Sequence, residues 1–378
     1  MLLFKHTYFW LCLFFSLLFI SCNTSNKYNN DIKSKLDNLL KSEIQSSEPG
    51  GSVLLKKGEE IIYLKNFGLA DLKTKEKITE HTVFNTGSIS KTFVSNGILI
   101  LKERGLLSLD DSLSKYFKDF KNKEIANKIQ IKHLLSHSSG LPDNRKVDEN
   151  IEFYLTAKDT ENFAPLKLAD SLNFQPGEKY EYSNPAFNGL ALIIEQVTKE
   201  KWQKFIIENI LTPSKMSDSK ITDGAYPQNN VAHAYKLIDG HYIENDYGEV
   251  PTFAASGNSG IWSSVMDLAN YEHSIKEGKF LSKKSLKDSR SIFKPKNWKD
   301  TIDPNIGYSW FITPNTKSRY KLNIIYHTGE VGGFHSFYFY FPSKDVLFVG
   351  LFNKPLKKYA EIINKALDLC NDHNWFDK

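Results

Sequence analysis

The sequence predicts an α/β fold in which segments from both ends of the chain form one lobe, with a mostly helical segment inserted between them. Runs of β-branched and aromatic residues bounded by turn residues lie toward the two ends, and apolar residues at helical spacing dominate the middle. The chain has 378 residues, 40% apolar and 25% charged, which is ordinary for a globular protein and excludes disordered and collagen-like chains. We expect one domain over residues 31–378, with its α/β lobe at residues 31–105 and 255–378 and its helical lobe at residues 106–254.

The start of the chain carries the signals of an exported protein. A 13-residue apolar run over residues 8–20 is shorter than the about 20 residues of a membrane-spanning helix, and it suits a signal peptide. The following Ser21-Cys22 resembles the lipoprotein box of bacteria, in which the cysteine is lipidated and becomes the mature N-terminus. We predict a signal peptide at residues 1–21, a flexible tether at residues 22–30 and a lipid anchor on Cys22 in the bacterial cell envelope. A plain signal peptide or an uncleaved anchor is the alternative.

The first elements of the α/β lobe follow the tether. Residues 31–46 carry apolar side chains at helical spacing, which predicts an amphipathic helix. Residues 52–55 and 61–64 are strand-like runs on either side of a polar loop that contains Gly58, which is a hairpin signal.

Helical patterns then dominate until strands return near the C-terminus. Apolar residues recur at helical spacing from Phe93 to Leu106 and again at residues 190–197 and 205–210. Three later runs read as strands, and a closing helix follows them: residues 323–326, 336–341, 346–352 and then 356–369. Strands and helices at both ends of a helical middle give the α/β lobe with its insertion.

A Ser-x-x-Lys motif is the first candidate for chemistry. The chain contains five copies, which begin at Ser88, Ser112, Ser217, Ser291 and Ser318. Only Ser88 follows a glycine and opens an apolar helical run. Residues three apart on a helix share one face, so Ser88 and Lys91 can touch, and a helix N-terminus favours developing negative charge. The alternative for Ser88, which accounts well for the other copies, is a helix cap beside a solvated lysine.

Two further motifs are candidates for proton transfer and substrate contact. Tyr182-Ser183-Asn184 offers a phenol that a nearby ammonium would help to lose its proton, although a surface turn gives the same pattern. Ser256-Gly257-Asn258 is a rival second motif, which ranks lower because its glycines look loop-forming. His327-Thr328-Gly329 follows a strand, and its glycine would let a substrate backbone approach closely; an edge strand is the structural alternative.

Together and in this order, the three motifs resemble those of the serine β-lactamase and penicillin-binding-protein superfamily. The Tyr-x-Asn form is similar to its branch of class C β-lactamases, D-Ala-D-Ala carboxypeptidases and esterases. Flanking segments resemble the same family over roughly residues 48–355: residues 84–93, 106–111, 133–141, 174–177 and 341–342. The resemblance implies an antiparallel sheet flanked by helices, built from both chain ends, with a mostly helical insertion.

The resemblance also implies a role for each motif residue. It makes Ser88 the acylated nucleophile, Lys91 its neighbouring amine and Tyr182 the general acid/base. It implies that four residues contact the substrate: Asn184, His327, Thr328 and Gly329. The oxyanion hole would be formed by the backbone N–H groups of Ser88 and Glu330, which supply electrostatic stabilisation in acyl transfer.

These roles predict a serine hydrolase that forms an acyl-enzyme on Ser88 with an amide or ester substrate. His327 stands where class C β-lactamases have lysine, and a neutral imidazole would not hold a β-lactam carboxylate as an ammonium does. We therefore favour a peptidase-like or esterase-like hydrolase acting on D-amino-acid or peptidoglycan-type peptides, or on other small molecules. A true β-lactamase and a catalytically silent penicillin-binding sensor lipoprotein are the alternatives.

No cofactor or metal is expected. His133 and His137 have the spacing of two ligands on a helix, but Leu134 stands where a metalloprotease has glutamate, so we interpret both as packing histidines. Cys370 is expected to pack on the last helix. A net charge of +5 is too small and scattered to indicate nucleic acid, so the expected partners are the substrate and, through the N-terminal lipid, the membrane.

Overall fold

The computed structural model describes residues 31–41, 44–147, 149, 153, 157–221, 223, 226–245, 256–357 and 359–372. The contacts divide these residues into two compact units. One contains the helix over residues 31–41 and α12 (Tyr359–Asp372), in which Cys370 is buried as expected. The other is Gln45–Pro355. Within the described part of the chain, no helix is both long and apolar enough to cross a bilayer. The signal peptide, the tether and Cys22 lie outside the described residues and stay predictions.

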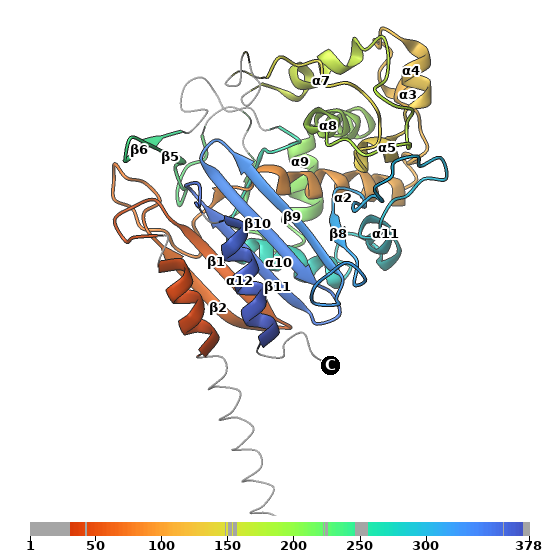
Figure 1. Cartoon of the computed structure of the whole chain (residues 1–378). Coiled ribbons are helices and arrows are strands. Elements are labelled where there is room, and N and C mark those ends of the chain that lie inside the picture. The colour runs from red at the N-terminus through yellow and green to blue at the C-terminus, as the bar shows by residue number, and fades with distance from the viewer. Residues whose placement is uncertain are drawn as a thin grey trace, which may run out of the picture. The chain divides into compact units, whose positions relative to one another are not determined.

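An antiparallel sheet of six strands forms the centre of the Gln45–Pro355 unit (Figure 1), in the order β2-β1-β11-β10-β9-β8. Its strands are β1 (Gly51–Lys57), β2 (Glu60–Phe67), β8 (Phe311–Thr313), β9 (Ile324–Val331), β10 (Phe334–Phe341) and β11 (Val346–Phe352). The pairing of β1 with β11 joins segments from the two ends of the chain. The sequence-based prediction of an α/β fold with an antiparallel sheet is confirmed.

Burial explains which strands are central. All seven residues of β11 are buried, as is typical of a strand covered on both faces. By contrast, β2 exposes Glu60, Ile61 and Lys65 at one edge of the sheet, and the three-residue β8 forms the other edge. The predicted strand at residues 323–326 is longer in the structure, where β9 continues to Val331 and so includes the His-Thr-Gly motif.

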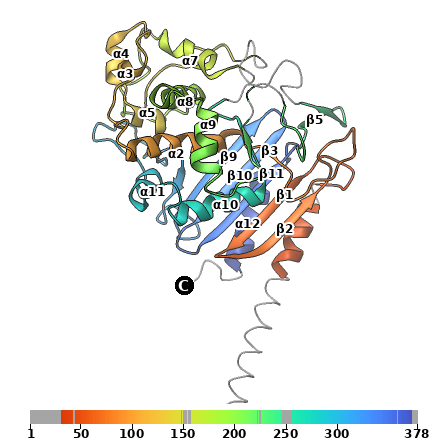
Figure 2. The ribbon, with the colours of Figure 1, turned by 180° about the vertical axis from the view of Figure 1, so that it is seen from behind.

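One helix packs on the sheet, and a second forms the centre of a group of helices. The helix α10 (Val265–Lys276) packs against β1 and β11, and α2 (Ser90–Glu103) contacts α8 (Asn184–Thr198) and α9 (Trp202–Ile206). Figure 2 shows α10 on the near side of the sheet, with α2, α8 and α9 above it and to its left. Every residue of α2 from Ser90 to Leu101 is buried, including the polar side chains of Ser90, Lys91, Thr92, Ser95 and Asn96.

The middle of the chain is mostly helical, as predicted, but it also contains short strands. Its other helices are α3 (Leu113–Tyr116), α4 (Lys123–Lys128), α5 (Ile131–Leu135), α7 (Asp159–Lys167), the π-helix η2 (Ile207–Leu211) and, further on, α11 (Lys283–Ser289). Two small sheets accompany them, composed of β3 (Phe84–Asn85), β7 (Ile261–Ser263) and β4 (Lys220–Ile221), and of β5 (Tyr235–Ile238) and β6 (His241–Glu244). The lobe boundaries stay a prediction.

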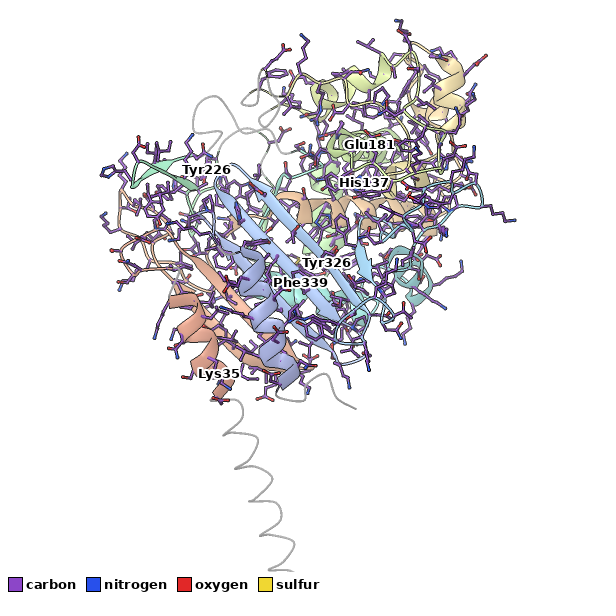
Figure 3. All side chains as sticks on the ribbon, in the orientation of Figure 1. Lys35, His137, Glu181, Tyr226, Tyr326 and Phe339 are labelled. Atoms are coloured by element: carbon purple, nitrogen blue, oxygen red, sulfur yellow. The ribbon has the colours of Figure 1, made fainter. Side chains whose placement is uncertain are left out.

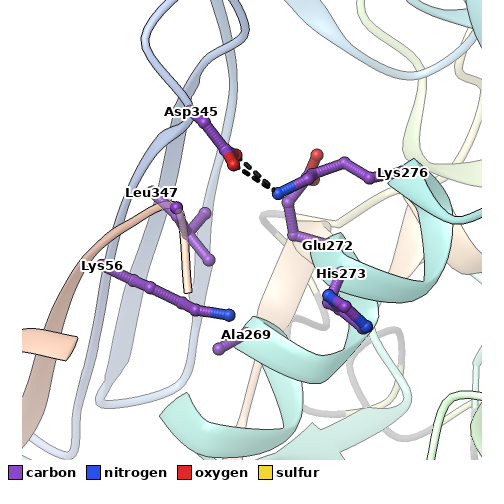
Figure 4. Close-up of a pocket in the computed structure, with 8 residues that line it drawn as sticks. Lys56, Ala269, Glu272, His273, Lys276, Asp345 and Leu347 are labelled. Carbon is purple, nitrogen blue, oxygen red and sulfur yellow. Dashed lines mark hydrogen bonds and ion pairs between the residues drawn. The ribbon is translucent and has the colours of Figure 1, made fainter. Parts of the chain in front are cut away.

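A buried ion pair connects α10 with the residue after α11. The Arg290 guanidinium donates to both carboxylate oxygens of Glu272, at 2.7 and 2.6 Å, and it stacks 4.5 Å from the centre of the Trp310 ring. The Tyr338 hydroxyl also donates to Glu272. Glu272 borders a small pocket between α10, β1 and β11, where Lys276 is paired with Asp345 (Figure 4). The charges around this pocket are therefore matched within the fold.

We expect Glu272→Gln to destabilise the protein by about 3–5 kcal/mol, because it leaves the Arg290 guanidinium buried without its counter-charge. The measurement is the urea midpoint of the purified protein. Glu149→Gln is the control, since Glu149 pairs with Lys146 where both side chains are about two-thirds or more exposed, and such pairs contribute little. Equal midpoints for the two variants would contradict this account of Glu272.

Candidate active site

Ser88 lies where the chain turns from the strand β3 into the helix α2. It is the middle residue of the 3-10 turn η1 (Gly87–Ile89), which leads directly into α2. The Asn85 side chain accepts a hydrogen bond from the backbone N–H of Gly87 at 2.8 Å. Gly87 has φ +53°, and a Cβ there would lie 2.8 Å from the backbone nitrogen of Glu330. The glycine before the serine is therefore required by both conformation and space.

The strand β9 packs tightly against this turn. A Cβ on Gly329 would lie 2.1 Å from the Thr86 carbonyl oxygen and 3.0 Å from the Ser88 nitrogen, so only glycine fits. The Ser336 hydroxyl on β10 donates to the same Thr86 carbonyl at 2.8 Å. The backbone nitrogens of Ser88 and Glu330, which are the expected oxyanion donors, therefore belong to two segments in direct contact.

Lys91 lies one helical turn from Ser88, as the motif spacing predicts. Its Nζ is 2.9 Å from Ser88 Oγ and 2.8 Å from the backbone oxygen of Asn258. The side chain is fully buried. Burial, followed by the nearby charge of Arg145, lowers the pKa of Lys91 well below its ordinary value. The site thus favours a neutral amine, which can accept a proton from the serine hydroxyl.

Tyr182 completes a group of three side chains around the serine. The Lys91 Nζ lies 5.2 Å from the centre of the Tyr182 ring. The expectation that a neighbouring ammonium favours the phenolate is wrong. Desolvation raises the pKa of Tyr182 to about 12, although its interaction with the Ser88 side chain acts in the opposite direction. The residue is 37% exposed, so Tyr182 lies between the buried Lys91 and the protein surface.

His327 contributes no positive charge to the site. It is 1% exposed, and its Nδ1 donates to the Thr328 carbonyl oxygen at 2.6 Å. Burial lowers the pKa of His327 to about 3, although the hydrogen bond with the Thr328 carbonyl acts in the opposite direction. Its Nε2 is buried and has no hydrogen-bond partner among the described residues. The imidazole is therefore neutral, as we assumed when we compared His327 with the lysine that class C β-lactamases have at this position.

Asn184 and Asn258 belong to two competing motifs, of which the sequence analysis favoured the one that contains Asn184. Asn184 is exposed at the first turn of α8 and follows Ser183, whose hydroxyl caps that helix. Asn258, from the lower-ranked rival motif, supplies the carbonyl that contacts Lys91. Tyr182 from the first motif and Asn258 from the second therefore both lie beside Lys91, so the sequence ranking underestimated the second motif.

A buried polar network supports the Asn258 carbonyl. The Asn258 side chain donates to Asn188 at 2.9 Å, and Asn188 donates to Asp159 at 2.6 Å. Asp159 also accepts from the Gly257 backbone and from the Trp202 indole, each at 2.8 Å. Burial raises the pKa of Asp159 to about 7 despite these donors. No signal in the sequence identified Asp159 or Asn188, because Asp159 belongs to none of the motifs and Asn188 is one polar residue within the helix that follows Tyr182-Ser183-Asn184.

Three of the other Ser-x-x-Lys motifs, and His133, make their contacts elsewhere in the fold. Three of the other Ser-x-x-Lys lysines bind elsewhere: Lys115 to Asp111, Lys220 to two backbone carbonyls and Lys294 to Asp303. His133 accepts the backbone N–H of Gln130 through Nδ1. Within the described ranges, no group of three or more His, Cys, Asp or Glu side chains is arranged to hold a metal ion.

Comparison with known proteins gives the class. A family model described as Beta-lactamase matches residues 32–369, so the chain belongs to the beta-lactamase family, whose members are generally serine hydrolases. Protein flp of Staphylococcus aureus is 27% identical over 358 residues, which cover 90% of this chain and 68% of the relative.

Two solved structures share the fold. The penicillin-binding protein of Bacillus halodurans superposes with a TM-score of 0.75 at 22% identity, covering 88% of this chain and 98% of its own. The D-amino acid amidase of Ochrobactrum anthropi SV3, solved with L-phenylalanine amide, superposes with a TM-score of 0.74 at 21% identity, covering 92% of this chain and 99% of its own. At these identities the similarity establishes the fold.

Proposed function

We propose that the protein hydrolyses an amide or ester through an acyl-enzyme on Ser88, with Lys91 as the proton acceptor and Tyr182 as the general acid/base. The observation that carries this proposal is the 2.9 Å contact between the Lys91 Nζ and the Ser88 hydroxyl in a fully buried setting that favours the neutral amine. An activated nucleophile needs a base within hydrogen-bond reach, and Lys91 meets that requirement.

These side chains and one water molecule account for every proton transferred in the two half-reactions. Ser88 Oγ attacks the substrate carbonyl carbon and passes its proton to Lys91, while the N–H groups of Ser88 and Glu330 hold the carbonyl oxygen as it becomes an oxyanion. The Tyr182 phenol then donates a proton to the leaving nitrogen as the carbon–nitrogen bond breaks, and Lys91 returns a proton to Tyr182. In the second half-reaction water attacks the acyl carbon, its proton passes to the Lys91–Tyr182 pair, and that pair reprotonates Ser88 as the acid leaves.

The wall of the site opposite Ser88, which we assign to His327, carries no charge and therefore favours amide or peptide substrates over β-lactams. We assign Asn184, Thr328 and Gly329 to contacts with the substrate amide, and His327 to that wall. The uncharged His327 offers no counter-charge to a β-lactam carboxylate. The structural similarity to an enzyme solved with L-phenylalanine amide supports an amino acid amide as the first substrate to test.

We expect the protein to hydrolyse D-phenylalanine amide with a kcat/KM at least about tenfold above that for benzylpenicillin, because placing a charged carboxylate against a neutral wall costs more than about 1.4 kcal/mol of binding. The same panel includes L-phenylalanine amide and a p-nitrophenyl ester. His327→Lys should raise acylation by benzylpenicillin relative to amide hydrolysis. A wild-type protein that turns over penicillin fastest would establish a β-lactamase, and acylation without turnover of any substrate would establish a silent sensor.

A further inference from the structure

We propose that His137 is a positioning residue that holds Tyr182 in register with Ser88 by stacking on its ring and binding the backbone on both sides of it. This proposal rests on the acid/base role of Tyr182 in the proposed function. His137 comes from the loop after α5, more than 40 residues before Tyr182 in the sequence. Figure 3 labels His137 and Glu181, whose backbones are joined by a hydrogen bond.

The contacts of His137 surround Tyr182. The imidazole stacks on the Tyr182 ring with 4.3 Å between ring centres and 23° between the planes. Its Nδ1 accepts the backbone N–H of Ser183 at 2.9 Å, and its carbonyl accepts the backbone N–H of Glu181 at 2.9 Å. The residues before and after Tyr182 are thus both bound by His137, so the direction of the phenol depends on it.

The backbone of His137 is fixed by the end of α5. It has φ +52° and is 1% exposed. The Ser138 N–H donates to the His133 carbonyl and the His137 N–H to the Leu134 carbonyl, which is the pattern of a Schellman helix ending, with a left-handed residue at the position of His137. The helix ending therefore sets the position from which the His137 ring reaches Tyr182.

The protonation of His137 suits this role. Because its Nδ1 accepts a hydrogen bond, the ring proton is on Nε2, which is buried without a partner among the described residues. Burial lowers the pKa of His137 well below its usual range. A neutral ring can stack on Tyr182 without favouring its phenolate, so Tyr182 keeps the proton that it donates to the leaving group.

Two variants separate positioning from folding. His137→Gly tolerates the positive φ and removes both the ring and the Nδ1 acceptor. His137→Asn also tolerates that φ and keeps an acceptor for the Ser183 N–H. His133→Asn is the matched control, since it alters the other histidine Nδ1 contact without touching Tyr182. Urea midpoints establish that each variant is folded, and kinetics are measured with D-phenylalanine amide and a p-nitrophenyl ester.

We expect His137→Gly to lower kcat for the amide by about 10²-fold with little change in KM, because proton transfer contributes about 10²–10⁴-fold. Acylation by the ester, measured as the burst of p-nitrophenol, should slow much less, since p-nitrophenolate leaves without a proton. His137→Asn should recover part of the loss, and His133→Asn should match the wild type. In the Tyr182→Phe background, His137→Gly should have almost no further effect, because coupled residues are not additive.

Equal losses for amide and ester, additive with Tyr182→Phe, would overturn the positioning role and leave His137 a structural residue. This outcome is distinct from failure of the proposed function. If Tyr182→Phe itself leaves amide hydrolysis unchanged, the acid/base assignment of Tyr182 is wrong. If Tyr182→Phe slows amide hydrolysis and His137→Gly adds independently, only the inference about His137 fails.

Discussion

Ser88→Ala is expected to abolish covalent labelling by a fluorophosphonate and to lower amide turnover by about 10⁶-fold, the order of magnitude reached when a serine nucleophile is removed. The physical reason is that Ser88 is the serine whose hydroxyl lies 2.9 Å from a buried amine. The variant should keep its fold, because the segment that holds Ser88 is fixed by Gly87, Thr86 and the strand β9 and not by the serine hydroxyl. Urea denaturation checks that expectation.

The other copies of the motif provide matched controls. Ser112→Ala and Ser291→Ala remove hydroxyls that bind Ser114 and the Lys287 carbonyl, away from the reacting group. Labelling and turnover should stay at the wild-type level in both. Loss of labelling in either of these variants, with labelling retained in Ser88→Ala, would show that the nucleophile is not Ser88.

Lys91→Met is expected to slow acylation of the amide by about 10²–10⁴-fold, because it removes the proton acceptor and keeps an apolar side chain of similar length in a fully buried position. The measurement is single-turnover kinetics with D-phenylalanine amide. Lys115→Met is the control, since Lys115 binds Asp111 in another copy of the motif. Acylation at the wild-type rate in Lys91→Met would show that another group takes the serine proton.

The pH dependence of kcat/KM tests the same assignment without a mutation. Lys91 acts only after it loses its proton, so kcat/KM should rise as pH increases through the lowered pKa of Lys91. Tyr182 acts while it holds its proton, so kcat/KM should fall again only as pH approaches about 12. In Lys91→Met the acid limb that belongs to Lys91 should disappear. An unchanged acid limb in that variant would assign it to another group.

The fold could be predicted where the local pattern is strong. The apolar run of β11 and the hairpin of β1 and β2 were recognisable because burial on one or both faces leaves a clear pattern of side chains. The strands β3, β4 and β7 have two or three residues each, which is too short for any alternation to be read. Their positions depend on pairing with distant segments.

The same distinction between local pattern and contacts of distant segments applies to the candidate site. Ser88 and Lys91 could be paired from sequence because helical spacing alone brings them to one face. The contact of Lys91 with Asn258, and the stacking of His137 on Tyr182, join segments far apart in the chain and follow from tertiary structure. The predicted direction of the Tyr182 pKa is wrong for a related reason: burial, which depends on tertiary structure, raises the pKa of Tyr182 and lowers that of the neighbouring Lys91.

Rapid-quench mass spectrometry of the wild-type protein with a p-nitrophenyl ester tests the central claim most directly. The account predicts a burst of p-nitrophenol together with one acyl group per chain, mapped to the peptide that contains Ser88 and lost at the rate of steady-state turnover. Turnover with no acyl group on that peptide at any time, or with a kinetically competent acyl group on another residue, would contradict it.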